Sequence, residues 1–239
     1  MVDDRFAGKS IPDPQFSGDD GQTSAEVAAA FNDFAAGHIT RAQLFETLLQ
    51  SRVFVPVKAI LDSHGVDDHG HKVEKDSHMA TVSIQAADGR KALLAFTATS
   101  NMSAWDEQAR PIAAHFATAI AAALDEGADA LLVDFRTDHQ IAVTRREMLL
   151  VANQLPVVDP FDDDVAMAIL SEVLRTIGTQ HEVTFEVSPA INGADVAIAL
   201  VGAQTEQADA ILQEVATGLN NREELRLRLA GGIALSIKQ

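Results

Sequence analysis

The chain has 239 residues, of which 47% are hydrophobic and only 5% aromatic, and its formal net charge is −17. This length accommodates one large domain or two small ones, with enough apolar residues for a packed core. A negative field of this size repels phosphate backbones and anionic lipid head groups, which argues against nucleic acid as a partner. Two interpretations stay open: a basic protein partner, or charge that serves solubility alone.

Cysteine is absent, which excludes disulfides, thiolate metal ligands and a cysteine nucleophile. The first residues, MVDDRFAGKSIPDP, carry early acids and lack the apolar segment of a secretory signal. No apolar run approaches the ~18 residues that a membrane span needs. We therefore expect a cytoplasmic protein without a membrane partner, and we expect no cofactor.

The N-terminal part predicts an arm followed by two capped helices. Residues 1–22 are rich in Pro, Gly, Asp and Gln and show no periodicity, which is typical of a disordered or extended arm. Capping boxes begin at Thr23 and Thr40, each before apolar residues at helical spacing. Gly37 is expected to end the first helix.

A β-hairpin is predicted over residues 79–97. Asp88-Gly89 separates two segments with alternating apolar residues and is a strong signal for a two-residue turn. Such a turn would pair Ile84 with Leu93 and keep the apolar side chains of both strands on one face.

Pro56 and Pro111 indicate different local structures. Pro56 lies in a strand predicted over residues 52–60, and because it lacks an amide donor we expect a sheet edge or a bulge there. Pro111 suits the first position of a helix. We therefore expect a short turn around Trp105 and then a helix from Pro111 that ends at Gly127.

The segment after Gly127 predicts a central strand, a short strand and a third capped helix. Residues 128–135 are almost wholly apolar in the middle, as in a buried strand, and 140–143 follow a polar turn. A capping box at Thr144 begins the helix. Residues 155–160 contain two prolines and predict a linker, because residues before proline avoid the helical conformation.

The remaining residues predict a smaller second unit. Three acids at 162–164 stand at a helix start, where negative charge suits the helix dipole. Two strands and a helix are expected at residues 182–187, 195–201 and 206–219. The C-terminal ELRLRLAGGIALSIKQ predicts two paired strands, and only a three-residue turn at 230–232 places the apolar side chains of both on one face.

Together these elements predict an α+β fold, with a mixed or antiparallel sheet and helices packed on one face, divided into two small α+β units. The expected boundaries are an arm at 1–22, a first unit at 23–158 and a second unit at 159–239.

Three blocks carry a resemblance to a known family: SRVFVPVKA, ADGRKALLAFTATSNMSAWDEQARPI and EGADALLVDF. They resemble the opening strand, central block and following strand of the SseB family, the bacterial enhanced serine sensitivity proteins, and are closest to its actinobacterial type. The second unit is similar to the smaller C-terminal SseB module. The resemblance implies a non-enzymatic interaction or regulatory protein, linked to serine sensitivity by name alone. VDFRTDHQ departs from the Asn-Pro or Asp-Pro of many members.

Trp105 and Arg110 are the sharpest candidates for binding a partner. Trp105 is either an exposed anchor, since tryptophan is enriched at interaction hot spots, or a core residue that fills a corner between strand and helix. Arg110 either binds an anion near a helix start or forms an ion pair with Asp106 or Glu107.

Metal sites are weak candidates. His69 and His71 could bind one ion from the loop 62–78. The loop also contains lysines and a glutamate, and nothing fixes the ligand geometry, so a solvated loop is the alternative. The acids around 159–164 suggest either a magnesium site or helix capping.

The sequence contains no catalytic constellation: it has no Gly-x-Ser-x-Gly, and no triad can be nominated. We therefore expect a protein without enzymatic activity that binds an unidentified protein partner. The alternative is a sensor of an amino acid or anion, or an enzyme, with a pocket near Thr97, Ser100 and Arg110. A homo-oligomer formed through an exposed sheet edge is a third hypothesis.

Overall fold

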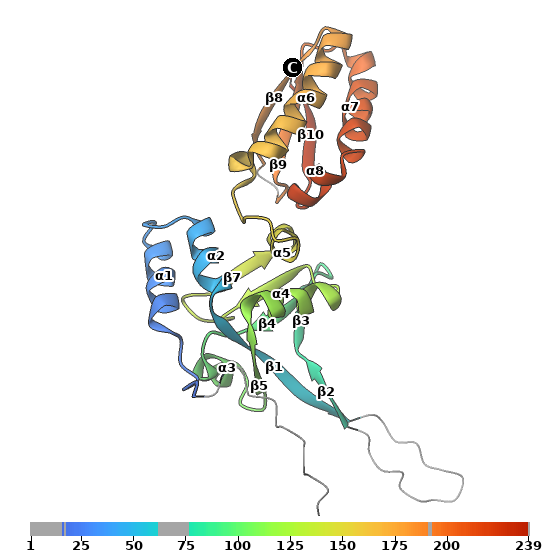
Figure 1. Ribbon diagram of the computed structural model, residues 1–239. Coiled ribbons are helices and arrows are strands. Elements are labelled where there is room, and N and C mark those ends of the chain that lie inside the picture. Colours follow the sequence, from blue (N-terminus) through green and yellow to red (C-terminus); the bar gives the residue numbers. More distant parts are fainter. Residues whose placement is uncertain (1–15, 17, 62–76, 191–192, 239) are drawn as a thin grey trace, which may run out of the picture.

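The computed structural model describes residues 16, 18–61, 77–190 and 193–238 (Figure 1). The helices are α1 (Ala25–Ala35), α2 (Arg41–Leu49), α3 (Thr99–Trp105), α4 (Phe116–Asp125), α5 (Arg145–Ala152), α6 (Asp164–His181), α7 (Thr205–Asn220) and α8 (Glu223–Arg228), with a 3₁₀ turn η1 (Pro160–Asp162). The strands are β1 (Arg52–Leu61), β2 (Ser77–Thr81), β3 (Ser83–Gln85), β4 (Lys91–Ala95), β5 (Arg110–His115), β6 (Ala130–Val133), β7 (Ile141–Thr144), β8 (Thr184–Pro189), β9 (Val196–Val201) and β10 (Ile233–Lys238). The α+β class is confirmed.

Two sheets of the N-terminal part interlock. Their strand orders are β2-β1-β5 and β3-β4-β6-β7. The chain passes from the first sheet to the second at Val82, between β2 and β3, and an antiparallel bridge joins Phe54 to Phe96. The end of β4 therefore lies against the start of β1, where the candidate site described below is built.

The larger apolar core lies on one face of these sheets. Helices α1, α2, α4 and α5 cover it, and their buried side chains include Phe31, Leu44, Phe116 and Leu150. The opposite face of β4 packs against α3, where Phe96 and Met102 are fully buried. Apolar residues at helical spacing explain why α1, α2 and α4 bury one side only.

The C-terminal part has its own sheet, with the strand order β10-β9-β8, and its own apolar cluster. Helices α6 and α7 pack on this sheet, and α8 packs against these two helices (Figure 1). Strands β9 and β10 are parallel, with α7 and α8 in the connection. Among the described helices, none is long and apolar enough to cross a membrane.

The capping boxes at Thr40 and Thr144 are confirmed. Each threonine hydroxyl accepts a hydrogen bond from the backbone amide three residues later, and the side chain of that later residue accepts one from the threonine amide. Helix α1 is instead capped by Ser24, one residue after Thr23. Gly37 and Gly127 follow the ends of α1 and α4 in the left-handed region, as expected.

The helix expected from Pro111 is wrong, since this residue lies in β5 and α4 begins only at Phe116. A separate helix, α3, occupies the predicted turn and ends at Trp105. Among the described strands, β5 pairs with β1 alone, and the alternation of hydrogen bonds places the nitrogen of Pro111 on the side away from β1. Proline is tolerated there because an edge strand needs no donor on its free side.

The edge position expected for Pro56 is also wrong, because β1 lies between β2 and β5. The nitrogen of Pro56 faces Val82, whose own amide donates to the Pro56 carbonyl at 3.0 Å. Val82 is where the partner strand breaks between β2 and β3. The missing donor thus coincides with an interruption of the ladder.

The two-residue hairpin turn is wrong by one residue. Ile84 pairs with Ala92 and not with Leu93, and the Ala86 amide donates to the Arg90 carbonyl. The turn therefore has three residues and ends at Gly89, which has a φ of 90°. A three-residue turn with glycine in the left-handed region is the next most common hairpin connection.

The C-terminal hairpin is wrong as well. Glu223–Arg228 forms helix α8, and β10 pairs in parallel with β9. Leu225 and Leu229 lie four residues apart, and both are buried in the second core. The alternation of Leu and Arg is typical of a strand, but spacing four also serves one helical face, and burial against α6 and α7 selects the helix.

Candidate functional site

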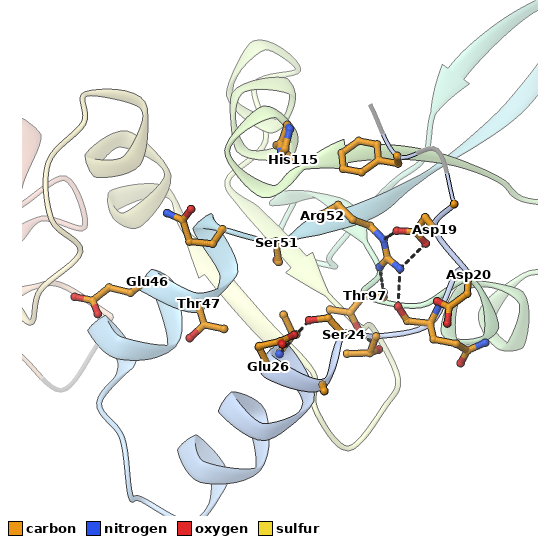
Figure 2. Close-up of a pocket in the computed structure, with 17 residues that line it drawn as sticks. Asp19, Asp20, Ser24, Glu26, Glu46, Thr47, Ser51, Arg52, Thr97 and His115 are labelled. Atoms are coloured by element: carbon orange, nitrogen blue, oxygen red, sulfur yellow. Dashed lines mark hydrogen bonds and ion pairs between the residues drawn. The ribbon is translucent and has the colours of Figure 1, made fainter. Parts of the chain in front are cut away.

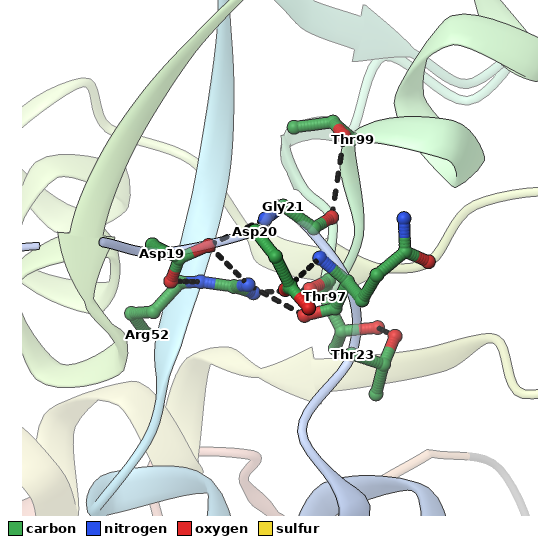
Figure 3. Close-up of polar contacts among 8 residues, drawn as sticks. Asp19, Asp20, Gly21, Thr23, Arg52, Thr97 and Thr99 are labelled. Carbon is green, nitrogen blue, oxygen red and sulfur yellow. Dashed lines mark hydrogen bonds and ion pairs between the residues drawn. The ribbon is translucent and has the colours of Figure 1, made fainter.

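Residues 18–23, which we call the N-terminal strap, lie across the junction of β1, β4 and α3 (Figure 3). The Gly21 carbonyl accepts from both the amide and the hydroxyl of Thr99. Gly21 is buried with a φ of 77°, and a Cβ there would meet the Thr99 hydroxyl at 2.7 Å. Only glycine fits this close approach. The rest of the expected arm, 1–15 and 17, lies outside the described residues.

Arg52, at the start of β1, binds the strap through its guanidinium. Its Nε and Nη2 donate to the two carboxylate oxygens of Asp19 at 2.5 and 2.8 Å, and Nη2 also donates to the Gln22 carbonyl. Its Nη1 donates to the Thr97 carbonyl at the end of β4. Four of the five N–H groups of a guanidinium are thereby used. The Arg52 and Asp19 side chains are only 12% and 22% exposed.

The pKa of Asp19 is held below its usual range, chiefly by the hydrogen bond from Arg52. The Gly21 amide, which donates to Asp19 Oδ1, acts in the same direction, and burial opposes both. The carboxylate is therefore ionised throughout the neutral range, and the pair is a charge-assisted contact of the stronger kind.

A buried polar network lies beneath this ion pair. The amide and hydroxyl of Thr97 donate to the two oxygens of Asp134, at 2.8 and 2.6 Å, and Asn101 adds a third donor. Since the Thr97 proton is used on Asp134, Thr23 must donate to Thr97 across their 2.7 Å contact. Thr97 and Asp134 are 2% and 1% exposed, so the two hydrogen bonds between them are shielded from water.

A cavity of about 970 Å³ opens beside the strap (Figure 2). The ends of α1, α2 and β1 form its walls, and Arg52 and Thr97 reach it from the network. Asp20, Glu26 and Glu46 line it and are exposed to solvent. The cavity thus combines one guanidinium, already bound to Asp19, with an acidic rim.

The hydroxyl groups of this cavity are used within the fold. Ser24 accepts from the Val27 amide as the cap of α1, and Ser51 donates to the Leu48 carbonyl. His115 lies against the ring of Phe16, with 5.1 Å between ring centroids. Among the described residues of the cavity, no serine or threonine is hydrogen-bonded to a histidine that could activate it.

The structure does not bring Thr97, Ser100 and Arg110 to one pocket. Thr97 reaches the cavity just described, whereas Ser100 is exposed on α3 and Arg110 is exposed in β5. The helix start expected at Arg110 does not exist, so the anion site argued from it loses its basis. Asp106, offered as a partner of Arg110, instead forms an ion pair with Lys58.

Trp105 falls between its two interpretations. It is partly buried at the end of α3 and stacks on Phe96, with 5.7 Å between ring centroids. The Lys58 ammonium lies 6.0 Å from the centre of its ring. One part of the indole therefore closes the smaller core, and another part remains in contact with solvent.

The metal candidates have different outcomes. His69 and His71 lie outside the described residues. Asp163 caps α6 by accepting from the Ala166 amide, and Asp159 accepts from the Phe161 amide at η1, which accounts for these two acids by capping. In the part of the chain that the structure describes, no group of three or more His, Cys, Asp or Glu is arranged to hold a metal ion.

A second polar centre joins the two parts of the chain. Arg146 on α5 is only 5% exposed, and it donates to the carbonyls of Val158 and Arg228. Its Nε lies 3.8 Å from Asp195. Its Nη2 has no hydrogen-bond partner among the described residues.

Sequence reasoning missed the main residues of the site, Asp19, Arg52 and Asp134. Asp134 was read as the end of a buried strand, where its φ of 51° marks the departure from the ladder. Nothing local in the sequence indicates that Asp19 meets Arg52.

The fold and this site define an α+β protein with a buried polar centre between two interlocked sheets. The profile described as the SseB protein N-terminal domain matches residues 26–149, more than half of the chain. The chain therefore belongs to the SseB family. No curated protein and no solved structure matches it.

Proposed function

We propose that the protein is a non-enzymatic interaction or regulatory protein of the SseB type that acts in the cytoplasm. The observation that supports this is the use of the cavity's polar groups. Arg52, Thr97 and the serine hydroxyls serve to hold the strap, the sheet and α1 together. A catalytic site instead needs a nucleophile or base whose reactive atom faces the substrate.

The partner we propose is a basic protein segment. Asp20, Glu26 and Glu46 are exposed around the cavity, and the chain as a whole carries a net charge of −17. Complementary charge steers association and selects partners. Trp105 lies on another face of the sheet and supplies a partly exposed ring for a second contact.

The test compares two pairs of charge substitutions. Glu26→Gln with Glu46→Gln removes two charges from the rim, and Glu107→Gln with Glu223→Gln removes two exposed charges elsewhere. Purified protein is immobilised, and bound proteins from the host lysate are quantified by mass spectrometry at low and high salt. We expect the rim pair to lose the bound basic partner, and the other pair to keep it. Equal recovery by both pairs, or turnover of a substrate by the purified protein, would contradict the proposal.

A sensor of a small ligand is the second candidate, and a specific observation favours it. The cavity contains a guanidinium near exposed carboxylates, which suits the two charged ends of a free amino acid. A thermal-shift screen of amino acids and anions, with serine included, discriminates the candidates. A ligand-dependent rise in melting temperature supports the sensor, and no rise with any compound opposes it.

We also propose that residues 159–239 form the family's smaller C-terminal module. The separate apolar cluster of α6, α7, β8, β9 and β10 supports this division.

A further inference from the structure

Arg52 is held in place by groups that do not belong to the strap. Its Nη1 donates to the Thr97 carbonyl at the end of β4, and its guanidinium carbon lies 4.2 Å from the centre of the Phe54 ring. Both partners are buried parts of the sheet. The guanidinium would therefore keep its orientation if the strap moved away, because two anchors fix its plane.

The edge that Arg52 presents to the strap is the edge that binds carboxylates. Nε and Nη2 lie side by side and donate to Asp19 Oδ2 and Oδ1, so the contact is bidentate (Figure 3). Planar bidentate pairing is the preferred mode by which arginine recognises a carboxylate. Asp19 thus occupies the place that the carboxylate of a ligand would take.

Among the described residues, one backbone–backbone hydrogen bond, from Thr99 to Gly21, joins the strap that delivers Asp19 to the fold beneath it. Beyond the contacts to Arg52, its described hydrogen bonds to the rest of the fold run from Thr99 to Gly21 and between Thr23 and Thr97. Asp20, the next residue, accepts from the Gln22 amide within the strap, and this is its one hydrogen bond among the described residues. The cavity of about 970 Å³ lies directly alongside and gives access to the same guanidinium (Figure 2).

We propose that Arg52 is a binding site for the carboxylate of a small molecule, and that Asp19 is a built-in competitor which occupies the site when no ligand is bound. An incoming carboxylate accepts from Nε and Nη2 of Arg52 in place of Asp19, which swings into solvent, so Arg52 stays paired with one negative charge. A tethered competitor acts at an effective concentration in the millimolar range, so ligands of the intact protein bind weakly unless they make further contacts. This inference rests on the small-ligand candidate above and names the carboxylate as the group that Arg52 binds, but it does not depend on the basic protein partner.

The experiment titrates sodium acetate against the protein at constant ionic strength, with sodium chloride as the balancing salt, and follows the Arg52 Nε–H resonance. Asp19→Ala removes the competitor, and Asp20→Ala is the matched control, because it deletes a neighbouring acid without contact to Arg52. We expect Asp19→Ala to bind acetate about ten-fold more tightly than the wild type, and Asp20→Ala to bind like the wild type.

Two further variants test whether a change in acetate binding comes from misfolding and whether binding requires Arg52. Asp19→Asn keeps the shape of the side chain, and it serves where Asp19→Ala alters the circular dichroism spectrum. Adding Arg52→Gln to the Asp19→Ala background should abolish acetate binding, measured there by calorimetry. The inference is overturned if the folded Asp19 variants bind acetate no better than Asp20→Ala, or if binding survives the loss of Arg52.

Discussion

The two parts of the chain differ in what they bury. The N-terminal part buries Thr97, Asp134, Arg146 and Glu147, whereas Asp163 is the one buried charged or polar side chain among the described residues of the C-terminal part. Glu147 binds Arg41 across 106 positions of sequence, and Thr97 binds Asp134 across 37. The apolar cluster of the C-terminal part is stabilised chiefly by burial, which is non-directional.

This difference indicates where function is to be sought. A buried polar group costs free energy unless each donor and acceptor is paired, and paired networks fix one arrangement of the chain. The N-terminal part uses such a network to present Arg52 at the edge of a cavity. The C-terminal part contains an apolar cluster without a comparable polar network among its described residues.

The largest effect is expected from a test of whether the two parts unfold separately. Leu170 is fully buried in the C-terminal core, and Leu170→Ala should cost about 3 to 4 kcal/mol of unfolding free energy. Leu131→Ala makes the same change in the N-terminal core. If the division predicted near residue 159 holds, calorimetry shows two transitions, and each variant lowers a different one. A single transition lowered by both would show one cooperative unit.

Much of the secondary structure was predictable from local signals. Thr40 and Thr144 were read correctly because a capping box involves residues only three apart. The turn at Gly89 and the helix at Leu225 were misread because two local solutions satisfy the same pattern, and packing decides between them. Register and helix type therefore needed the tertiary contacts.

The site was less predictable than the fold. Thr97 lines the cavity beside the strap, but the sequence grouped it with Ser100 and Arg110, which do not line that cavity. Its partners Asp134 and Arg52 are 37 and 45 positions away, and Asp19 lies 33 positions before Arg52. No spacing rule connects residues on different strands, so only the pairing of β1, β4 and β6 reveals the centre.

The second prediction concerns the polar network itself. Asp134→Ala leaves the buried amide and hydroxyl of Thr97 without their acceptor and should cost about 2 to 3 kcal/mol in urea unfolding. Asp134→Asn is the matched control. Its amide can donate to the Thr97 hydroxyl, which then turns to donate to Thr23, so the chain of bonds reverses and the loss should be smaller. An equal loss for both variants would show that charge matters more than hydrogen bonding.

The smallest effect is expected where the two parts meet. Burial raises the pKa of Asp195, although the Gly231 amide and the Arg146 guanidinium act in the opposite direction. A carboxyl with a raised pKa in the folded state holds its proton longer there than in the unfolded chain. Stability from this group is therefore greatest at low pH, and it declines as pH rises from the unfolded value through the folded pKa.

Asp195→Asn removes this titration while keeping an oxygen for the Gly231 amide. We expect the melting temperature of the variant, relative to the wild type, to rise as the pH increases above the ordinary pKa of an aspartate, about 4, and to stay level once Asp195 is ionised in the folded state as well. Thermal unfolding at several pH values checks this. The opposite trend would mean that the 3.8 Å contact with Arg146 outweighs burial. In that case an ion pair between Arg146 and Asp195 holds the two parts together. The interface would then depend on charge, although the interior of the C-terminal part is apolar.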